Sequence, residues 1–236
     1  MTDGLGNLPR TIERIVAARP DAVTMFEGTA THCWPPYAGV LALIVQMGCA
    51  TPDDRIAETL GSVSGAVRLG ADAVALGINV RGKTEGYSLR ILSNTATEAE
   101  RFGLPVIAHI YPRASDDSPV IVTDPENVAW AVRCGIECGA DIIKVPYPGE
   151  PDAFREIVDS CPVPIVAAGG PRTQTFDQAL SQAAAAISSG ASGLTVGRNV
   201  WGRGRDTLAA ISAYKLVVHD GIDPAKALEA VHTLQT

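Results

Sequence analysis

Short apolar runs alternate with longer amphipathic stretches along almost the whole chain, and this alternation restricts the fold more than any other feature. One run and the stretch after it take up roughly 30 residues, the length of a strand-and-helix unit in a parallel sheet. The runs expected to form strands are 21–26, 41–47, 71–80, 105–111, 141–146, 164–168 and 193–196. Seven such strands predict an α/β protein whose sheet is either doubly wound or closed as a barrel.

The amphipathic stretches predict helices over 8–18, 56–69, 85–102, 125–137, 151–160, 175–189, 206–218 and 224–234. Asp124 and Pro125 have the form of a helix cap followed by proline at the first helical position. A doubly wound sheet usually has a glycine-rich turn after its first strand, and residues 26–29 do not form one. No linker rich in proline, glycine or serine divides the chain, so a single domain over residues 1–236 is expected.

Composition excludes several classes of protein. Of the 236 residues 46% are hydrophobic, which is ample for a core, and the net charge is −7 with the basic residues scattered. That scatter argues against a nucleic-acid-binding face, but not against a small anionic substrate. Neither a signal peptide nor an apolar run long enough to span a membrane is present. The five irregularly spaced cysteines, with Cys134 and Cys138 expected in core packing, indicate a reduced, cytoplasmic setting.

Lys144 is the residue that points most directly to chemistry. It lies in the apolar, strand-like run 139–147, whereas Lys83, Lys215 and Lys226 fall in a turn or in surface helices. Burying an unpaired ammonium costs several kcal/mol, so such a group tends to lose its proton. A neutral amine at a strand end is a nucleophile, and its usual product with a carbonyl is a Schiff base. The alternative is a strand-end lysine that extends to solvent or to an aspartate, and spacing alone does not decide between the two.

Two glycine-containing turns follow the last two expected strands. They contain Gly169, Gly170 and Arg172 in one case, and Gly197 and Arg198 in the other. In barrel enzymes the loops after strands seven and eight commonly bind phosphate. Glycine lets N–H groups approach an anion, and arginine adds charge-assisted hydrogen bonds. Two such turns on consecutive strands favour a phosphate site, although glycine after a strand is common.

His109 and Tyr111 close the strand before the one that carries Lys144, and residues two apart share a face of a strand. If that face is the inner one, the Tyr111 hydroxyl lies beside Lys144 and is a plausible general acid or base. We interpret His109 as a hydrogen-bonded core residue. Glu27 ends the first strand as a pocket residue or a cap, and Asp141 is expected to shape the entrance of its strand.

At these residues the chain resembles the archaeal-type class I aldolases, a family with the DhnA-type, DeoC/FbaB-like fold. The resemblance runs from about Ala22 to the C-terminus. It rests on Ala71-Asp72-Ala73-Val74, Tyr111-Pro112-Arg113, Gly139-Ala140-Asp141-Ile142-Ile143-Lys144, Gly169-Gly170-Pro171 and Gly197-Arg198-Asn199. Members include fructose-bisphosphate aldolases, synthases of aminodideoxyheptulosonate and thiolases that act on phosphorylated signalling sugars.

The resemblance implies a (β/α)8 TIM barrel, with Lys144 as the Schiff-base lysine and Tyr111 as the proton-transfer residue. It implies that the substrate phosphate binds Gly169, Gly170, Gly197 and Arg198, and the residue analysis adds Arg172. No cofactor and no metal are expected, because the four histidines are dispersed. Members often form rings, so a homo-oligomer is expected.

Two departures from the family stand out. Members begin with a strand that carries an Asp-His-Gly motif, whose aspartate assists catalysis. Residues 1–6 look like the stretch after that motif, so Asp3 is not expected to be that aspartate, and the first barrel strand is expected upstream of Met1. If the 236 residues were the whole protein, weak or absent aldolase activity is expected. Ile110 stands where aldolases of this group often have a bulkier residue, which leaves the substrate preference open.

The predicted function is a Schiff-base-forming aldolase that acts on a phosphorylated ketose or dihydroxyacetone phosphate. A transaldolase or thiolase of the same family is one alternative. A catalytically impaired barrel that binds a sugar phosphate or a partner is another, and the missing aspartate motif favours it somewhat. A third alternative, an isomerase that only recognises phosphate, would not need Lys144.

Overall fold

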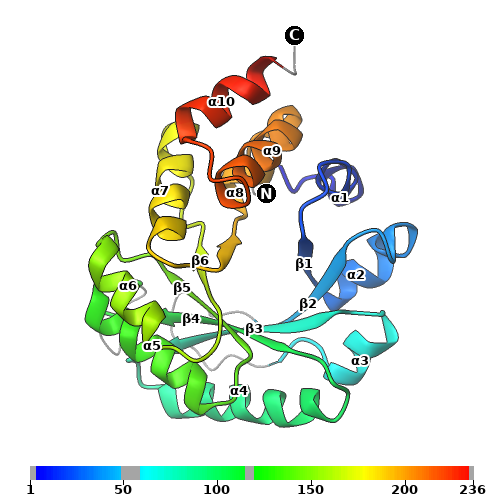
Figure 1. Ribbon diagram of the computed structural model, residues 1–236. Coiled ribbons are helices and arrows are strands. Elements are labelled where there is room, and N and C mark those ends of the chain that lie inside the picture. Colours follow the sequence, from blue (N-terminus) through cyan, green and yellow to red (C-terminus); the bar gives the residue numbers. More distant parts are fainter. Residues whose placement is uncertain (1–3, 49–58, 115–119, 234–236) are drawn as a thin grey trace.

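The computed structural model describes residues 4–48, 59–114 and 120–233. Its strands form one sheet, in which each strand runs parallel to the next in chain order. They are β1 (Ala22–Phe26), β2 (Ala42–Gly48), β3 (Ala73–Val80), β4 (Val106–Pro112), β5 (Ile142–Pro146), β6 (Ile165–Ala168) and β7 (Gly193–Thr195). The sheet is curled, and the helices lie on its outer side (Figure 1). All seven predicted strands are confirmed, each within about two residues of its expected ends.

The helices of the described residues mostly follow the predicted ranges. They are α1 (Leu8–Ala17), α2 (Glu27–Cys33), α3 (Val63–Arg68), α4 (Glu85–Glu100), α5 (Pro125–Glu137), α6 (Pro151–Asp159), α7 (Phe176–Ser188), α8 (Arg198–Trp201), α9 (Thr207–Val218) and α10 (Pro224–Thr233). The cap at the start of α5 is confirmed, because Asp124 Oδ1 accepts a hydrogen bond from the Asn127 N–H at 3.1 Å. The short helices α2 and α8 were not expected.

The prediction of a helix from residue 56 was wrong for its described part, because α3 begins only at Val63. Ser62 is the cap: its hydroxyl accepts from the N–H of Gly65 at 3.0 Å, and its own N–H donates to Glu27 Oε2 at 3.1 Å. A carboxylate that arrives from the end of β1 therefore fixes where α3 starts. Glu27, expected to line the pocket, to cap or to pair, here holds the capping residue Ser62 by accepting from its N–H.

The sheet is open between β1 and β7, each of which pairs with one neighbour among the described strands. Helix α1 packs against both α2 and α9, so the layer of helices bridges this opening (Figure 1). The α/β architecture with a curled parallel sheet is confirmed. An eighth strand upstream of Met1 stays a prediction, and Asp3 lies outside the described residues.

Alternate residues of each strand face opposite sides of the sheet, and the two sides differ in size and polarity. The outer side holds the main core beneath the helices, including Ile78, Ile110 and Ile143, all at most 1% exposed. The inner side holds a small apolar cluster, which consists of Ala73, Ala75 and Ile107 with Ile44 and Ile142 packed against it. Buried polar side chains, among them Gln46, Asn79 and His109, lie on the same side.

A carboxylate at the entrance of two strands holds the register of the sheet. Asp72, just before β3, accepts a hydrogen bond from the N–H of Leu43 in β2 at 2.8 Å. Asp141, just before β5, accepts one from the N–H of Val106 in β4 at 2.8 Å. The expectation that Asp141 shapes its strand entrance is confirmed, and the bond fixes β5 against the strand that carries His109 and Tyr111.

Gly135, near the C-terminal end of α5, lets this helix approach β4 and β5 closely. A Cβ at this position would lie 2.8 Å from Cδ1 of Ile143 and 3.0 Å from Cδ1 of Ile110. Those contacts are shorter than carbon atoms tolerate, so glycine is needed here for packing. Helix α5 thus supports the two strands of the candidate site from behind.

Substituting Gly135→Ala should lower the free energy of unfolding by about 1–2 kcal/mol, because overpacking outweighs the better helix propensity of alanine. Denaturant unfolding followed by circular dichroism measures this change. Gly86→Ala in α4 is the matched control, since no atom lies within 4 Å of its Cβ position. The control should be neutral or stabilising, and a Gly135→Ala variant as stable as the control would contradict the close-packing argument.

Candidate active site

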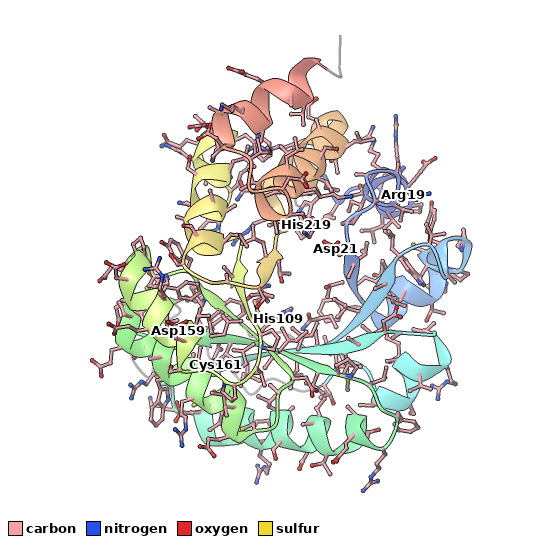
Figure 2. All side chains as sticks on the ribbon, viewed as in Figure 1. Arg19, Asp21, His109, Asp159, Cys161 and His219 are labelled. Carbon is pink, nitrogen blue, oxygen red and sulfur yellow. The ribbon has the colours of Figure 1, made fainter. Side chains whose placement is uncertain are left out.

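The side chains of His109 and Lys144 lie next to each other inside the curled sheet. The two residues are partners in the register of β4 and β5. They continue the inward-facing series of Ile107 and Ile142, which form part of the floor of the interior. Tyr111, two residues beyond His109, faces the same side. The condition that the sequence left open, whether this face is the inner one, is therefore met, and His109 is seen among the strands within the layer of helices (Figure 2).

Lys144 is held in an environment that opposes its charge. Burial lowers the pKa of Lys144 to about 8, and the positive charge of Arg198 contributes to the decrease. No carboxylate among the described residues forms an ion pair with it, so the alternative of a lysine paired with an aspartate finds no support. With a pKa near 8, roughly a tenth of the amine is neutral at pH 7, which is enough to supply a nucleophile.

His109 and Tyr111 are both neutral near pH 7. Burial raises the pKa of Tyr111, which the charge of Arg198 partly opposes, so its phenol keeps its proton. Burial, followed by the charge of Lys144, holds the pKa of His109 well below its usual range. His109 is buried as predicted, at 7% exposure, and the hydrogen bond expected for its ring stays a prediction.

Arg198 connects the amine with the loops at the ends of the last two strands. It is the first residue of α8, directly after the turn that follows β7, and its charge acts on both Lys144 and Tyr111. The arrangement thus brings together one nucleophilic amine, one phenol and one permanent cation, contributed by three different strand ends. The predicted arginine thus lies within electrostatic range of each member of the predicted catalytic pair.

Both glycine turns have a packing reason for their glycines. Gly170 has a φ of 63°, which few other residues adopt. A Cβ on Gly169 would lie 3.0 Å from Cα of Val196, and one on Gly197 would collide with the ring of Trp201. The structure therefore explains these residues without an anion, and their role in phosphate binding stays a prediction.

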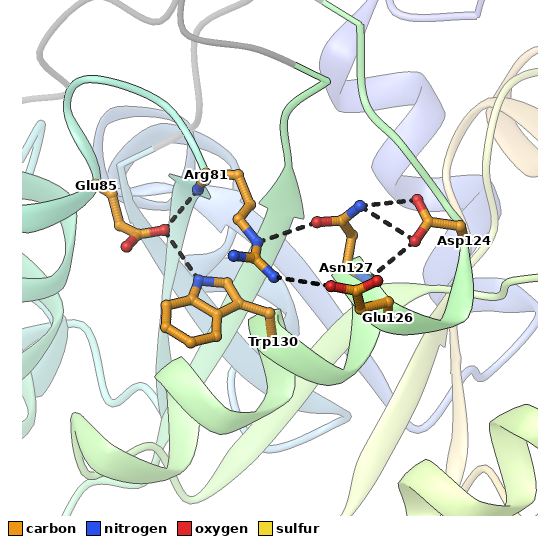
Figure 3. A network of polar contacts seen from close by, with 6 residues as sticks. All are labelled: Arg81, Glu85, Asp124, Glu126, Asn127 and Trp130. Atoms are coloured by element: carbon orange, nitrogen blue, oxygen red, sulfur yellow. Dashed lines mark hydrogen bonds and ion pairs between the residues drawn. The ribbon is translucent and has the colours of Figure 1, made fainter.

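A polar network connects the turn after β3 with the first turns of α5 (Figure 3). Arg81 follows β3 with a φ of 69°, and its guanidinium lies 4.4 Å from the centre of the Trp130 ring. Its Nε donates to Asn127 Oδ1 at 3.0 Å, while Glu85 Oε2 accepts from the Arg81 N–H at 2.6 Å and from Trp130 Nε1 at 3.0 Å. The network fastens the β3–α4 turn to α5.

Two hollows of about 420 and 750 Å³ open at the other end of the sheet, where the strands begin. The first is lined in part by Asp21 and Asp72, the second by Glu100, Glu137 and Asp141. Carboxylate-lined hollows are unsuited to an anionic substrate. The strand ends that carry Lys144 therefore remain the candidate site for such a substrate.

Metal and membrane features are not found in the described part of the chain. There, no three histidine, cysteine, aspartate or glutamate side chains gather so that they could hold a metal ion. Cys134 and Cys138 pack in or against the main core, as predicted. None of the helices among these residues is long and apolar enough to cross a bilayer.

Comparison with known proteins decides the family. The sequence profile of the DeoC/LacD family aldolases matches residues 1–203. The chain belongs to this family. The predicted resemblance is confirmed, and with it the assignment of the chain as an aldolase-type lyase.

Three relatives illustrate the range of this aldolase family. A 2-amino-3,7-dideoxy-D-threo-hept-6-ulosonate synthase of Halobacterium salinarum is 36% identical over 231 residues, which cover 96% of this chain and 84% of that protein. A class 1 fructose-bisphosphate aldolase of Thermoproteus tenax is 35% identical over 189 residues, covering 78% and 71%. A solved archaeal fructose-1,6-bisphosphate aldolase, with its catalytic lysine bound to the carbinolamine intermediate, superposes with a TM-score of 0.80 at 33% identity, covering 89% and 84%.

Sequence analysis of this aldolase did not single out Arg203. Its guanidinium lies 4.1 Å from the centre of the Phe176 ring, and its Nε donates to the carbonyl oxygen of Asn199 at 3.0 Å. Burial lowers the pKa of Arg203, and the charge of Arg172 contributes. The one available signal was spacing, because Arg203 stands four residues after Asn199, just beyond the end of α8 at Trp201.

The stability of the aldolase should depend on pH through Lys144. Because its pKa is lowered to about 8 in the folded state, the unfolded chain binds the extra proton between about pH 8 and 10.5, and stability rises with pH over that window. Replacing Lys144→Met removes this cost, so the variant should gain about 3 kcal/mol relative to the parent at pH 7, and lose that advantage by pH 11. Denaturant titrations at both pH values measure the difference. Lys226→Met serves as an exposed control, and a pH-independent difference for Lys144→Met would contradict the lowered pKa.

The reactivity of Lys144 should respond to Arg198. Its modification by an acylating reagent, followed by mass spectrometry, should rise with pH around a midpoint near 8. Arg198→Gln removes a positive charge that lowers the pKa of Lys144, so this midpoint should move to higher pH. Arg198→Lys keeps the charge and should leave the midpoint close to that of the parent. If the midpoint were the same in all three proteins, Arg198 would have no electrostatic role at the amine.

Proposed function

We propose that this chain is a class I aldolase that forms a Schiff base through Lys144 and acts on a phosphorylated ketose or on dihydroxyacetone phosphate. The observation that carries the proposal is an amine inside a parallel sheet whose pKa is lowered to about 8. Membership of the DeoC/LacD aldolases adds to it, as does the carbinolamine on the catalytic lysine of a solved archaeal relative.

Substrate binding begins with the phosphate, which is held by N–H groups of the turns at Gly170 and Gly197. The N–H of Gly169, which was also expected to bind it, donates instead to the carbonyl of Thr195 at 2.9 Å. The charges of Arg172 and Arg198 add to the attraction. Because the anion is bound at the ends of β6 and β7, the ketone of the same molecule extends towards β5. Orientation of this kind converts the attack of the amine into an effectively unimolecular step.

The neutral Lys144 Nζ then attacks the ketone carbon to give a carbinolamine. Tyr111 gives a proton to the hydroxyl that leaves as water, and an iminium forms. The iminium accepts the electron pair of the adjacent C–C bond when that bond breaks. The hydroxyl of the departing carbon gives its proton to the Tyr111 phenolate, and this carbon becomes an aldehyde. Tyr111 returns the proton to the carbon of the resulting enamine, and the addition of water to the iminium, with loss of a proton to Tyr111, releases the ketone and the free amine. The side chains present supply every step, so the proposal needs neither metal nor cofactor.

Two classes of carbonyl partner have support from relatives: that of an aminodideoxyheptulosonate synthase and that of a fructose-bisphosphate aldolase. The Halobacterium salinarum synthase matches almost the whole of this chain, and the Thermoproteus tenax aldolase matches a shorter part at similar identity. We therefore propose a phosphorylated ketose donor and leave both partner classes open. A transaldolase or thiolase would use the same amine. We further propose a cytoplasmic homo-oligomer, with the eighth strand of the barrel supplied upstream of Met1.

Borohydride trapping with dihydroxyacetone phosphate tests the proposal. The expected product is a covalent adduct on the peptide that contains Lys144, detected by mass spectrometry and absent from Lys144→Met. Lys215→Met is the matched control. Lys215 lies on the outer helix α9 and donates to the carbonyl of Arg19, so its replacement should leave the adduct intact.

Each alternative function predicts a different result in the same assay. Phosphate-dependent binding without any adduct would identify a barrel that binds sugar phosphates without catalysis. Turnover retained by Lys144→Ala would identify an isomerase-like enzyme. Either result would overturn the aldolase proposal.

A further inference from the structure

The side chain of Asn199 joins the two glycine turns. It is 1% exposed. Its Nδ2 donates to the carbonyl oxygens of Gly169 at 3.2 Å and of Pro171 at 3.0 Å. Its Oδ1 accepts from the N–H of Thr173 at 3.0 Å, whereas the single proton of the Thr173 hydroxyl has its nearest acceptor in the carbonyl of Thr175 at 2.6 Å. A residue of α8, the helix directly after β7, therefore makes three hydrogen bonds to the turn after β6.

These bonds use both donors of the amide and one lone pair of its oxygen. The backbone of Asn199 is held as well, since its carbonyl accepts from Arg203, whose guanidinium stacks on Phe176 of α7. The turn is also held from the other side. Gly169 donates its N–H to the carbonyl of Thr195 in β7 at 2.9 Å. Asn199 is thus a fixed point between the two turns.

The bonds to Gly169 and Pro171 determine which way the neighbouring N–H groups point. In a planar trans peptide the carbonyl and the following N–H point in opposite directions. When Asn199 holds the carbonyls of Gly169 and Pro171, the N–H groups of Gly170 and Arg172 are turned away from it. The same bonds keep two carbonyl oxygens, which would repel an anion, on the far side of the turn.

We propose that Asn199 is a positioning residue for the substrate phosphate: it orients the turn after β6 so that the N–H groups of Gly170 and Arg172 face the anion. The inference rests on the proposed function, because it assumes that these turns bind the phosphate. The inference adds to the proposed site a residue whose side chain forms hydrogen bonds within the protein and does not touch the substrate.

The test compares dihydroxyacetone phosphate with dihydroxyacetone in the borohydride trapping assay, using the parent, Asn199→Ala and Asn199→Ser. For the phosphorylated ketone, half-maximal trapping in the two variants should need about 10- to 100-fold more substrate. Trapping of dihydroxyacetone should stay within about twofold of the parent, because Lys144 and its pKa are untouched. Inhibition of the parent reaction by inorganic phosphate should weaken in the variants by a similar factor.

Asn127→Ala is the matched control, because Asn127 also joins two elements, the β3–α4 turn and α5, away from the glycine turns. It should keep the preference for the phosphorylated ketone. Equal losses for both ketones in the Asn199 variants, an unchanged preference, or failure of both variants to fold would overturn the inference. If the parent itself shows no preference for the phosphorylated ketone, the proposed phosphate site fails, and that result is distinct from a parent preference that survives Asn199→Ala.

Discussion

A lysine inside a parallel sheet, with no carboxylate partner among the residues that the structure describes, is the constraint on which the candidate site depends. In water the amine of Lys144 would stay protonated across the physiological range, whereas inside the sheet burial makes the charged form costly. Arg198 increases that cost, and it does so from the turn that is also expected to attract the substrate. One arginine can therefore favour the neutral amine and the bound anion together. The neutral state of His109 fits the same logic, since a third cation beside these two would be more costly still.

The backbone of the molecule is arranged to keep these groups in register. Parallel strands take their relative height from hydrogen bonds and from what packs behind them. Here Asp141 holds the start of β5 against β4, while the close approach of α5 at Gly135 fixes the same two strands from outside. The active face consequently needs little apolar material of its own. Its small floor of alanine and isoleucine is enough, because the main core lies on the opposite side of the sheet.

Much of the fold could be predicted because buried parallel strands are continuous apolar runs, and these runs are visible without any tertiary information. The start of α3 could not, since a glutamate distant in sequence decides it. The shared face of His109 and Tyr111 followed from strand periodicity, but its inward direction did not, and the two turns were visible from their glycines. The setting of His109 depended on its pairing with Lys144 in the next strand, and Arg203 showed no pattern beyond one spacing. The link made by Asn199 is likewise tertiary, because it joins residues about 30 positions apart.

The order of strands also sets a length scale. Lys144 lies on β5 and the turn with Gly197 follows β7, so two strand spacings, roughly 10 Å, separate their backbones. Neither spacing can stretch, because each is a ladder of backbone hydrogen bonds. The sheet therefore fixes this distance. A molecule whose phosphate is bound at the Gly197 turn presents its ketone to Lys144 only if the chain between the two groups has the right number of atoms. Discrimination between short and long substrates would then be a property of the backbone alone, independent of the side chains that perform the chemistry.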